Sequence, residues 1–398
     1  MTAPLPRPLE GVIVVGLEQV IAGPFCTRQL AELGARVIKI ERPGGDAARG
    51  YDRAVHGESS HFVWVNRSKE SLCLDLKRPE AKAVLDRLLA KADVFVQNLA
   101  PGAVERLGLG AAELRAKHPR LIWCGISGYG AGGPYSEKRA YDLLVQCEAG
   151  LPSVTGTPEQ PSKAGISVAD IAAGMYAMSS ILAALYRRAQ QGVGATLDIT
   201  MFESLGEWMG FPAYFAAYGG AAPARTGAHH ATIVPYGPFR TADGTVFLSI
   251  QNEREFERFC DVVLANPALK ADPRFNPGPA RAQNREAMHA EIDKVFSRMA
   301  SADALRKLDE AGIANARLNS MQEFWDHPQL EARGRWCEIG SPAGPIDAMM
   351  PPFNLDRFEP RMDAVPAIGE HGRAILAELG FSSSDIEKMQ KEGILHEA

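Results

Sequence analysis

The chain has 398 residues, of which 46% are hydrophobic and 23% are charged, and its formal net charge is −5. This length and composition are sufficient for a full buried core and for two domains. The mild acidity, without any long basic run, excludes a general electrostatic attraction to nucleic acid or to an anionic membrane surface. A local basic pocket for a small anion is still compatible with this composition.

The first third of the chain alternates between short apolar strands and amphipathic helices. We predict strands at 11–17, 36–41, 71–76, 93–99 and 120–127, and helices at 26–35 and 79–92. The second helix opens on Pro79, a residue that the first turn tolerates. Strands that alternate with helices predict an α/β fold with a parallel sheet covered on both faces. Ligands of such sheets bind at the carboxyl ends of the strands.

A single carboxylate, Asp170, precedes a stretch of small and apolar residues that carries no charge from Ile171 to Tyr186. The stretch is too short to span a bilayer and is apolar on all faces, so it predicts a buried helix of a soluble protein. Asp is a favoured N-cap, and capping a helix that begins at Ile171 is the simplest role for it. A desolvated carboxylate held ionised by amide groups and the helix dipole could equally be a nucleophile.

Beyond residue 200 the character of the sequence changes. The aromatic, Gly/Ala-rich segment 210–227 predicts a connection, and a strand at 245–251 is followed by helices near 253–265, 281–300 and 302–311. These elements indicate a smaller α+β unit. The Pro- and Gly-rich chain after Trp336 predicts an extended segment before a last helix at 372–380. We therefore expect a first part of a large domain at 1–205, a small domain with its connections at 206–335, and a return segment at 336–398.

Two motif classes are weak in this chain. The run GYGAGG at 128–133 fits a dinucleotide fingerprint, but Pro134 follows where the helix should open, so a flexible loop near a ligand is the simpler interpretation. The six cysteines stand apart, without a CxxC pair or a histidine at zinc spacing, and no metal is expected. Isolated cysteines, together with an N-terminus that lacks an apolar leader, favour a reducing, cytoplasmic setting.

Five stretches, in order, resemble the CaiB/BaiF family, the class III CoA-transferases. They are 20–46, 66–77, 94–108, 125–135 and 168–185, and a weaker likeness continues through 311–320 and 327–336. The resemblance implies a Rossmann-like large domain built from both chain ends, a smaller central domain, and an interlocked homodimer. It also implies acyl-CoA and small carboxylic acids as substrates, with no tightly bound cofactor and no nucleic-acid, membrane or metal partner.

The catalytic aspartate of the family falls on Asp170, which would attack an acyl-CoA thioester and form anhydride and aspartyl-CoA thioester intermediates. By position, the resemblance implies CoA contacts at Val20, Ile21, Arg42, Asn66, Arg67, Lys69, Asn98, Leu99, Ala100, Arg106, Arg139 and Tyr141. Racemases of the family have a histidine where Tyr141 precedes Asp142 here, which disfavours a 2-methylacyl-CoA racemase. The presence of Asp170 disfavours a third alternative, an inert CoA-binding protein.

Within the family, the chain is most similar to transferases of C4–C5 dicarboxylates. The expected donor is succinyl-CoA or a similar thioester, and the expected acceptors are itaconate, mesaconate, citramalate and malate. Intramolecular transfer of the mesaconyl-CoA type stays open, and the absence of a glycine-run loop between 237 and 262 makes oxalate an unexpected acceptor. A distal carboxylate needs a cationic or polar partner, and the candidates are Arg49, Arg225, His229, His230 and Tyr236.

Overall fold

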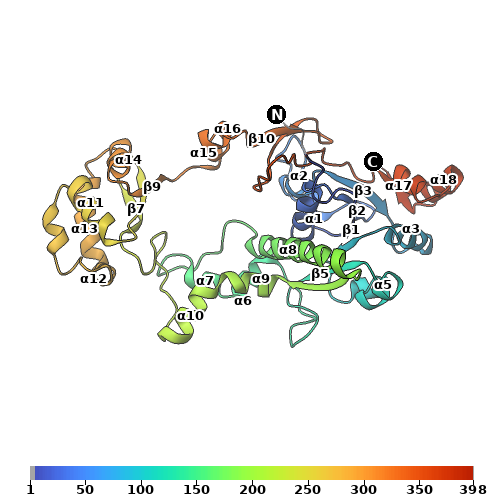
Figure 1. Ribbon diagram of the computed structural model, residues 1–398, viewed down its shortest axis with the longest axis horizontal. Helices are drawn as coiled ribbons and strands as arrows, with labels where there is room; N and C mark the ends of the chain where they lie inside the picture. Colours follow the sequence, from blue (N-terminus) through green and yellow to red (C-terminus); the bar gives the residue numbers. More distant parts are fainter. Residues whose placement is uncertain (1–4, 398) are drawn as a thin grey trace. The chain divides into compact units, whose positions relative to one another are not determined.

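The structure is a computed structural model, and it describes residues 5–397. Contacts between residues divide the chain into two compact units (Figure 1). Unit 1 comprises the chain up to Ala149, Gly165–Trp208 and the chain from Leu330 onward, and unit 2 comprises Gly150–Ala164 and Met209–Gln329. Unit 1 therefore draws on both ends of the chain. The stretch Gly150–Ala164 belongs to unit 2, although the sequence placed it within the first part.

Unit 1 is built on a seven-stranded sheet with the order β12-β3-β2-β1-β4-β5-β6. The strands are β1 (Ile13–Leu17), β2 (Arg36–Glu41), β3 (Lys69–Leu74), β4 (Val94–Gln97), β5 (Ile122–Ser127), β6 (Ala195–Thr200) and β12 (Leu395–His396). All neighbouring strands are parallel except β12, which runs antiparallel to β3. The predicted α/β fold with a parallel sheet is confirmed. The strand order reverses between β1 and β4, where ligands of such sheets bind.

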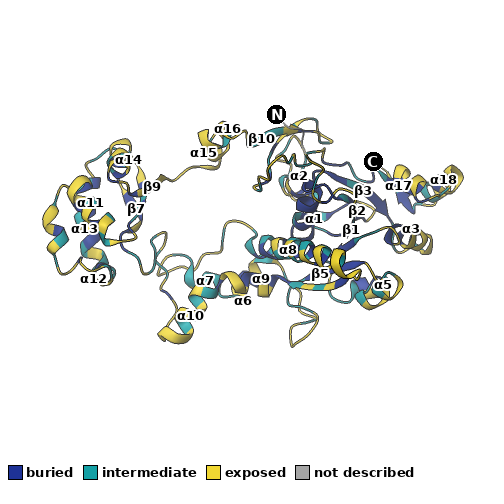
Figure 2. Ribbon diagram, viewed as in Figure 1, coloured by how far each residue is buried: buried dark blue, intermediate teal, exposed yellow. Residues whose placement is uncertain are grey.

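Helices cover both faces of this sheet because alternate strand residues are apolar on both faces. Val14 and Val94 pack in one core with α1 (Ala22–Glu32) and α8 (Val168–Gln191), whereas Val15 and Phe95 pack in the other with α3 (Pro79–Leu89). Figure 2 shows the buried sheet and the buried inner sides of these helices. The further elements of this unit are α2 (Ser60–Asn66), α4 (Ala103–Arg106), α5 (Ala111–Lys117), α6 (Asp142–Glu148), α9 (Met201–Trp208), α17 (Gly372–Glu378), α18 (Ser383–Lys391) and the hairpin of β10 (Trp336–Ile339) and β11 (Ile346–Met349).

Unit 2 has its own core around a three-stranded antiparallel sheet of order β7-β8-β9. The strands are β7 (Tyr236–Arg240), β8 (Thr245–Ser249) and β9 (Ala314–Arg317), and the main helices are α11 (Glu253–Arg258), α13 (Arg285–Phe296) and α14 (Ser301–Glu310). Shorter helices are α7 (Leu151–Val154), α12 (Gly278–Gln283) and α15 (Met321–Trp325), while α16 (Pro328–Ala332) crosses the boundary between the units. Phe256, Phe259 and Phe296 are fully buried between these elements. A smaller unit of mixed helices and strands was predicted at this place in the chain.

The segment predicted as a connection at 210–227 instead contains a helix, α10 (Gly210–Gly219). Its proline, Pro212, lies in the first turn, where it does not interrupt the helix. Aromatic side chains four residues apart then contact each other along the helix, with Tyr214 stacked on Tyr218 at 6.0 Å between ring centroids. The prediction was wrong because it gave the Gly and Pro content more weight than this spacing.

The start of α8 also differs from the prediction. The helix begins at Val168 with Ser167 as its N-cap residue, so Asp170 lies inside the first turn and not at the cap. It is 24 residues long, and by length and composition alone it could cross a membrane. The charge-free run therefore underestimated the length of the helix, which packs here against α1 and the sheet of unit 1.

Only one stripe of α8 is buried in the described chain. This stripe consists mostly of alanine and includes Gly174, where a Cβ atom would lie only 2.8 Å from the carbonyl oxygen of Ala22 on α1. The small side chains therefore permit the close approach of the two helices. Met175 and Tyr186 lie on the exposed side. The expectation of a helix buried on all faces is thus wrong for the single chain.

Four charged side chains that solvent does not reach come from β2, from the first residue of β3 and from the loops after β1 and β2. Lys39 Nζ lies 2.8 Å from Asp46 Oδ2, and Lys69 Nζ lies 2.7 Å from Glu18 Oε1. All four side chains are fully buried. Lys39 also donates to the backbone carbonyl of Glu18 at 3.2 Å, which links the two pairs. We call these four residues the buried charge network.

We predict that Lys39→Ala destabilises the protein by about 3–5 kcal/mol, because it leaves the Asp46 carboxylate buried without its cationic partner. Urea unfolding followed by circular dichroism measures this loss. The matched control is Lys117→Ala, which removes an exposed ion pair with Glu113 in the same unit and should change the unfolding free energy little. Equal effects of the two substitutions would contradict the importance of the network.

Candidate active site

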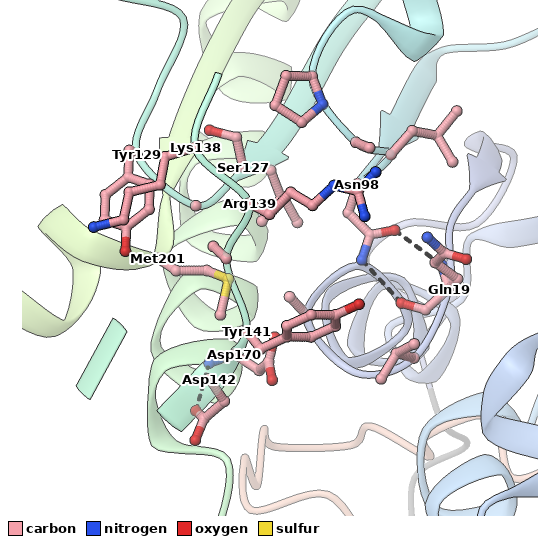
Figure 3. A pocket seen from close by; sticks show the side chains of 18 of the residues that line it. Gln19, Asn98, Ser127, Tyr129, Lys138, Arg139, Tyr141, Asp142, Asp170 and Met201 are labelled. Atoms are coloured by element: carbon pink, nitrogen blue, oxygen red, sulfur yellow. Dashed lines mark hydrogen bonds between the residues drawn. The ribbon is translucent and has the colours of Figure 1, made fainter. Parts of the chain in front are cut away.

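A cavity of about 360 Å³ opens at the carboxyl ends of β1, β4 and β5 (Figure 3). Its wall is formed by residues of unit 1 that follow these strands and by the first turn of α8. They are Gln19, Val20, Ala22, Asn98, Leu99, Ala100, Pro101, Ile126, Ser127, Gly128, Tyr129, Ser136, Lys138, Arg139, Ala140, Tyr141, Asp142, Asp170 and Met201. The cavity therefore lies where the strand order reverses, which is the expected ligand crevice of this fold.

The loop after β1 is held rigidly at the edge of the cavity. The Asn98 side chain accepts from Gln19 N and donates to Gln19 O, both at 2.9 Å. Val20 has a φ of +63°, which a β-branched residue rarely adopts. Its amide donates to both carboxylate oxygens of Asp46, at 3.1 and 3.2 Å. The buried charge network thus stabilises a strained backbone conformation next to the site.

Asp170 contributes its carboxylate to the cavity from the first turn of α8. Burial raises the pKa of this carboxyl, and the negative charge of Asp142 raises it further, to about 7. In the part of the chain that the structure describes, no hydrogen-bond donor offsets these two effects. The pKa of Tyr51 is also raised, mainly by burial and then by the charges of Asp46, Tyr141 and Asp170, so these groups share one electrostatic environment.

The first turn of α8 is capped from another helix. Asp142, the first residue of α6, accepts with Oδ1 from Ala169 N at 2.8 Å and from Asp170 N at 3.4 Å. Gln146 Nε2 donates to the second oxygen of Asp142 at 2.6 Å. The predicted capping role of Asp170 is therefore wrong. The amide groups expected to stabilise its carboxylate are instead bonded to Asp142.

Half of the predicted CoA contacts line this cavity. They are Val20, Asn98, Leu99, Ala100, Arg139 and Tyr141. Ile21 is buried below the loop, and the exposed side chains of Arg42 and Arg106 do not line the cavity wall. Carboxyl ends of parallel strands meet at one edge of the sheet, which is why residues from three separate sequence stretches meet here.

Three further predicted CoA contacts are committed to partners inside the protein. Lys69 Nζ donates to Glu18, to Asn66 Oδ1 at 3.1 Å and to the carbonyl of Pro24 at 3.0 Å. Arg67 is buried and donates to Glu32 and to the carbonyl of Met349. The structure therefore does not bring these side chains to the cavity. Their polarity marked a functional stretch in the sequence, but here it satisfies buried groups beneath the site.

Two predicted contacts of the distal carboxylate are likewise engaged. Arg49 in unit 1 donates to both carboxylate oxygens of Glu41, at 2.7 and 2.9 Å, and its guanidinium lies 3.7 Å from the ring centre of Phe62. Arg225 in unit 2 donates to the carbonyls of Thr157 at 2.9 Å and Pro158 at 2.8 Å. Arg49 therefore binds a side chain of its own unit, and Arg225 binds backbone carbonyls of its own unit.

The remaining candidates are His229, His230 and Tyr236, which lie in unit 2 together with a third histidine, His289. His230 stacks on Tyr236 with ring centres 5.2 Å apart, and its Nδ1 accepts from Ile233 N at 3.0 Å. The ring of His229 lies 4.5 Å from that of His289. Burial lowers the pKa of His229, whose Nδ1 has no hydrogen-bond partner within residues 5–397. His289 was missed in the sequence, because its place in a helix gave no signal of this contact.

Several residues of the cavity wall were also missed as site residues. Gln19, Ser127, Lys138 and Met201 line it, and the first two could have been found because Gln19 lies two residues beyond β1 and Ser127 is the last residue of β5. Lys138 forms an ion pair with Glu148. The Gly-rich run after β5 continues as a loop until α6 begins at Asp142, so it lacks the helix that a dinucleotide fingerprint requires.

A Rossmann-like strand order, with the Asp170 carboxylate at the ligand crevice, defines an α/β protein with a candidate active site at this place. Comparison with known families makes this specific. Residues 9–372 match the model of CoA-transferase family III, and the chain belongs to this family, a class of CoA-transferases that use acyl-CoA substrates.

Individual relatives match this chain over nearly its full length. The chain is 33% identical to the succinyl-CoA:glutarate CoA-transferase of Mus musculus, with 98% of this chain and 91% of that protein covered. It is 35% identical to the acetyl-CoA:oxalate CoA-transferase of Acetobacter aceti, over 93% and 95% of the two chains. The crystal structure of a CAIB/BAIF family protein from Brucella suis superposes with a TM-score of 0.84 at 32% identity, over 94% of this chain and 100% of that one.

The pKa of Asp170 predicts the pH dependence of activity. A carboxylate attacks only when it is ionised, so a rate that depends on Asp170 should be halved near pH 7 and about tenfold lower at pH 6 than on the alkaline plateau. Initial rates between pH 5 and 9, at saturating acyl-CoA and acceptor, measure this limb. Calorimetric binding of CoA over the same range separates loss of binding from loss of the nucleophile. A rate that stays flat down to pH 5 would refute the assignment.

Proposed function

We propose that the protein transfers CoA from succinyl-CoA, or a similar dicarboxylyl-CoA, to a C4–C5 dicarboxylate, with Asp170 as the nucleophile. One observation carries this proposal. Two carboxylates line the cavity, and Asp142 is bonded to backbone amides whereas Asp170 is not. Asp170 is also the position to which the family likeness assigns the catalytic aspartate.

The reaction proceeds through two kinds of covalent intermediate. The Asp170 carboxylate attacks the acyl carbonyl of the donor, and the C–S bond breaks. CoA leaves as a thiolate, and a mixed anhydride of the donor acid and Asp170 is formed. The thiolate then attacks the aspartyl carbonyl, which releases the donor acid and leaves an aspartyl-CoA thioester. The acceptor carboxylate displaces CoA from this thioester to form a second anhydride. Attack of the thiolate on the acceptor acyl group gives the new thioester and restores the Asp170 carboxylate.

The cavity offers groups for the charged parts of the substrates. Arg139 lines it and makes no ion pair with any residue between 5 and 397, so its guanidinium is available to a phosphate of CoA or to a carboxylate. Lys138 is partly neutralised by Glu148. Partial burial of Asp170 protects the anhydride and thioester from water, since both hydrolyse. Arg42 and Arg106 stay as proposed contacts of the nucleotide outside the cavity.

The choice of dicarboxylates is supported by the relatives, two of which carry glutarate or oxalate in their names. Itaconate, mesaconate, citramalate and malate are the C4–C5 acids that the sequence likeness favours. Transfer between two carboxyls of one molecule would use the same steps. A racemase is less favoured because Tyr141 occupies the place of the racemase histidine.

The first prediction of this proposal concerns Asp170→Ala. The variant should lose at least about a thousandfold in transfer rate while it keeps its fold and its affinity for CoA, because the side chain caps no helix. Rates, thermal unfolding and calorimetric CoA binding measure the three properties. Ser167→Ala, in the same turn, is the matched control and should retain transfer. Substantial turnover by Asp170→Ala would remove this residue from the mechanism.

The second prediction concerns the acceptor. With succinyl-CoA as donor, C4–C5 diacids, glutarate among them, should react on the order of a hundredfold faster than butyrate. The reason is that a charged group in a water-poor site needs a partner. His229→Ala should reduce the rate with diacids more than with butyrate, whereas His118→Ala, at the end of α5, should not. Mass spectrometry of the CoA products measures the preference, with oxalate included as the shortest diacid. If butyrate reacted as fast as the diacids, the protein would remain a CoA-transferase, but its acceptor acid would be unassigned.

We also propose that the protein is an interlocked homodimer. None of the residues of α10 is buried, and Phe211, Tyr214 and Tyr218 are each more than half exposed (Figure 2). Exposed aromatic patches of this kind mark protein interfaces. Sedimentation equilibrium should give twice the chain mass of 43.0 kDa, and Tyr214→Glu with Tyr218→Glu should weaken the association. A folded, active monomer in the wild type would reject the dimer.

A further inference from the structure

The sequence pattern at the start of α8 is that of a capping box. In S-x-x-D, the Ser oxygen accepts from the amide of the fourth residue, whose carboxylate in turn accepts from the amide of the Ser. Ser167 and Asp170 fit this pattern, but the Ser167 side chain makes no capping hydrogen bond. The Asp170 carboxylate is therefore not used by its own helix.

The same pattern forms a complete capping box elsewhere in this chain. At the start of α18, Ser382 Oγ accepts from Asp385 N at 3.2 Å, and Asp385 Oδ2 accepts from Ser382 N at 3.2 Å. The Ser382 hydroxyl, which also donates to Asp385 Oδ2 at 2.6 Å, and then the Ser382 amide hold the pKa of Asp385 below its usual range, whereas the pKa of Asp170 is raised. The two aspartates share a sequence pattern, so the difference must come from the surroundings of α8.

The surroundings supply a competing acceptor. Asp142 Oδ1 is bonded to the amide of Asp170, which is the group that Ser167 would use in a capping box, and to the amide of Ala169. Gln146, which is fully buried, fixes the other oxygen of Asp142. Figure 3 shows Asp142 and Asp170 next to each other at the cavity.

We propose that Asp142 is a positioning residue for Asp170. It caps α8 in place of Ser167, and so keeps the Asp170 carboxylate in the cavity without a capping hydrogen bond and beside the like charge of Asp142. The inference rests on the proposed role of Asp170 as nucleophile. A carboxylate without internal hydrogen bonds and beside a like charge is more basic and more nucleophilic than one in a capping box. The other charged or titratable groups around Asp170 are Tyr51, Tyr141, Lys138 and Arg139, and none of them replaces the contact of Asp142 with the helix.

The test follows the titration of Asp170 without any substrate. A diazo reagent esterifies a carboxyl in its acid form, and peptide mass spectrometry locates the ester on Asp170. In the wild type, labelling should be lost with a midpoint near pH 7. Asp142→Asn keeps an acceptor but removes the charge, and its midpoint should fall by about one unit. Asp142→Ala also permits the capping box, and its midpoint should fall by about two units.

A double variant separates charge from capping. Adding Ser167→Ala to Asp142→Ala removes the serine half of the box and should return the midpoint toward that of Asp142→Asn. Asp142→Ser, a second neutral acceptor, replaces Asp142→Asn if that protein does not fold. The matched control is Asp243→Asn, because Asp243 also caps a helix from outside, with Oδ1 at 2.7 Å from Ser301 N of α14. In Asp243→Asn, the pH midpoint for labelling of Asp170 should equal that of the wild type.

Two outcomes would overturn the inference. One is a midpoint in Asp142→Asn equal to that of the wild type, and the other is a double variant identical to Asp142→Ala. Activity gives an independent readout. In Asp142→Asn, the ratio of the transfer rate at pH 6 to that at pH 8 should rise about fivefold, because the ionised fraction at pH 6 rises from about one tenth to one half. A purely structural role would lower both rates equally. Labelling that shifts as expected in a protein without transfer activity would instead refute the proposed function alone.

Discussion

The buried charge network is the constraint on which the cavity depends. Lys39 and Lys69 are held in the interior by Asp46 and Glu18, and Glu18 directly follows β1, one of the strands whose ends border the cavity. Such groups are stable only as complete sets, since any single buried charge without its partner is strongly unfavourable. The same Asp46 carboxylate holds the amide of Val20 in a conformation that the residue would not adopt alone. The edge of the cavity is therefore rigid because the charges below it have no alternative arrangement.

The electrostatics of the cavity depend on a second arrangement of carboxylates. Asp142 accepts hydrogen bonds from two backbone amides of α8 and from the Gln146 side-chain amide. The pKa of Asp170, in the first turn of α8, is instead raised by burial and by the charge of Asp142, without such donors in the described chain. Environments that separate two neighbouring carboxylates in this way are a common means of assigning them different roles. Here the division arises because Asp142 accepts from the amides of the first turn of α8, so the Asp170 carboxylate receives no such donor within the described chain.

The two units contribute different kinds of information about function. Unit 1 contains the cavity, the family-defining stretches and the proposed nucleophile. Unit 2 carries the segment around His229, where a histidine pair lies beside Arg285, whose guanidinium bonds the carbonyls of His230 and Ala231 at 2.8 Å. The exposed aromatic side chains of α10 and the outer side of α8 are apolar surfaces that the single chain leaves uncovered. A second copy of the chain would cover such surfaces, which agrees with the proposed dimer.

The sequence by itself determined the parallel sheet, the positions of its first five strands along the chain and the family. These follow from local patterns: apolar strands alternate with amphipathic helices, and the five family stretches are continuous runs of residues. It also drew attention to Asp170, as the one acid before an uncharged run and by family likeness, and to the strand ends, because these lie at the ligand edge of a parallel sheet.

Only the tertiary structure decided how individual polar groups are used. Lys69 and Arg67 have the chemistry of ligand contacts, yet they donate to Glu18 and to the carbonyl of Met349, which are distant in the chain. The S-x-x-D pattern predicts a capping box at both Ser167 and Ser382, but a carboxylate from α6 occupies the amide in the first case. The physical reason is that a hydrogen-bonding or charged group takes whichever partner the fold brings within about 3 Å. Local sequence does not record that partner, because it comes from another part of the chain.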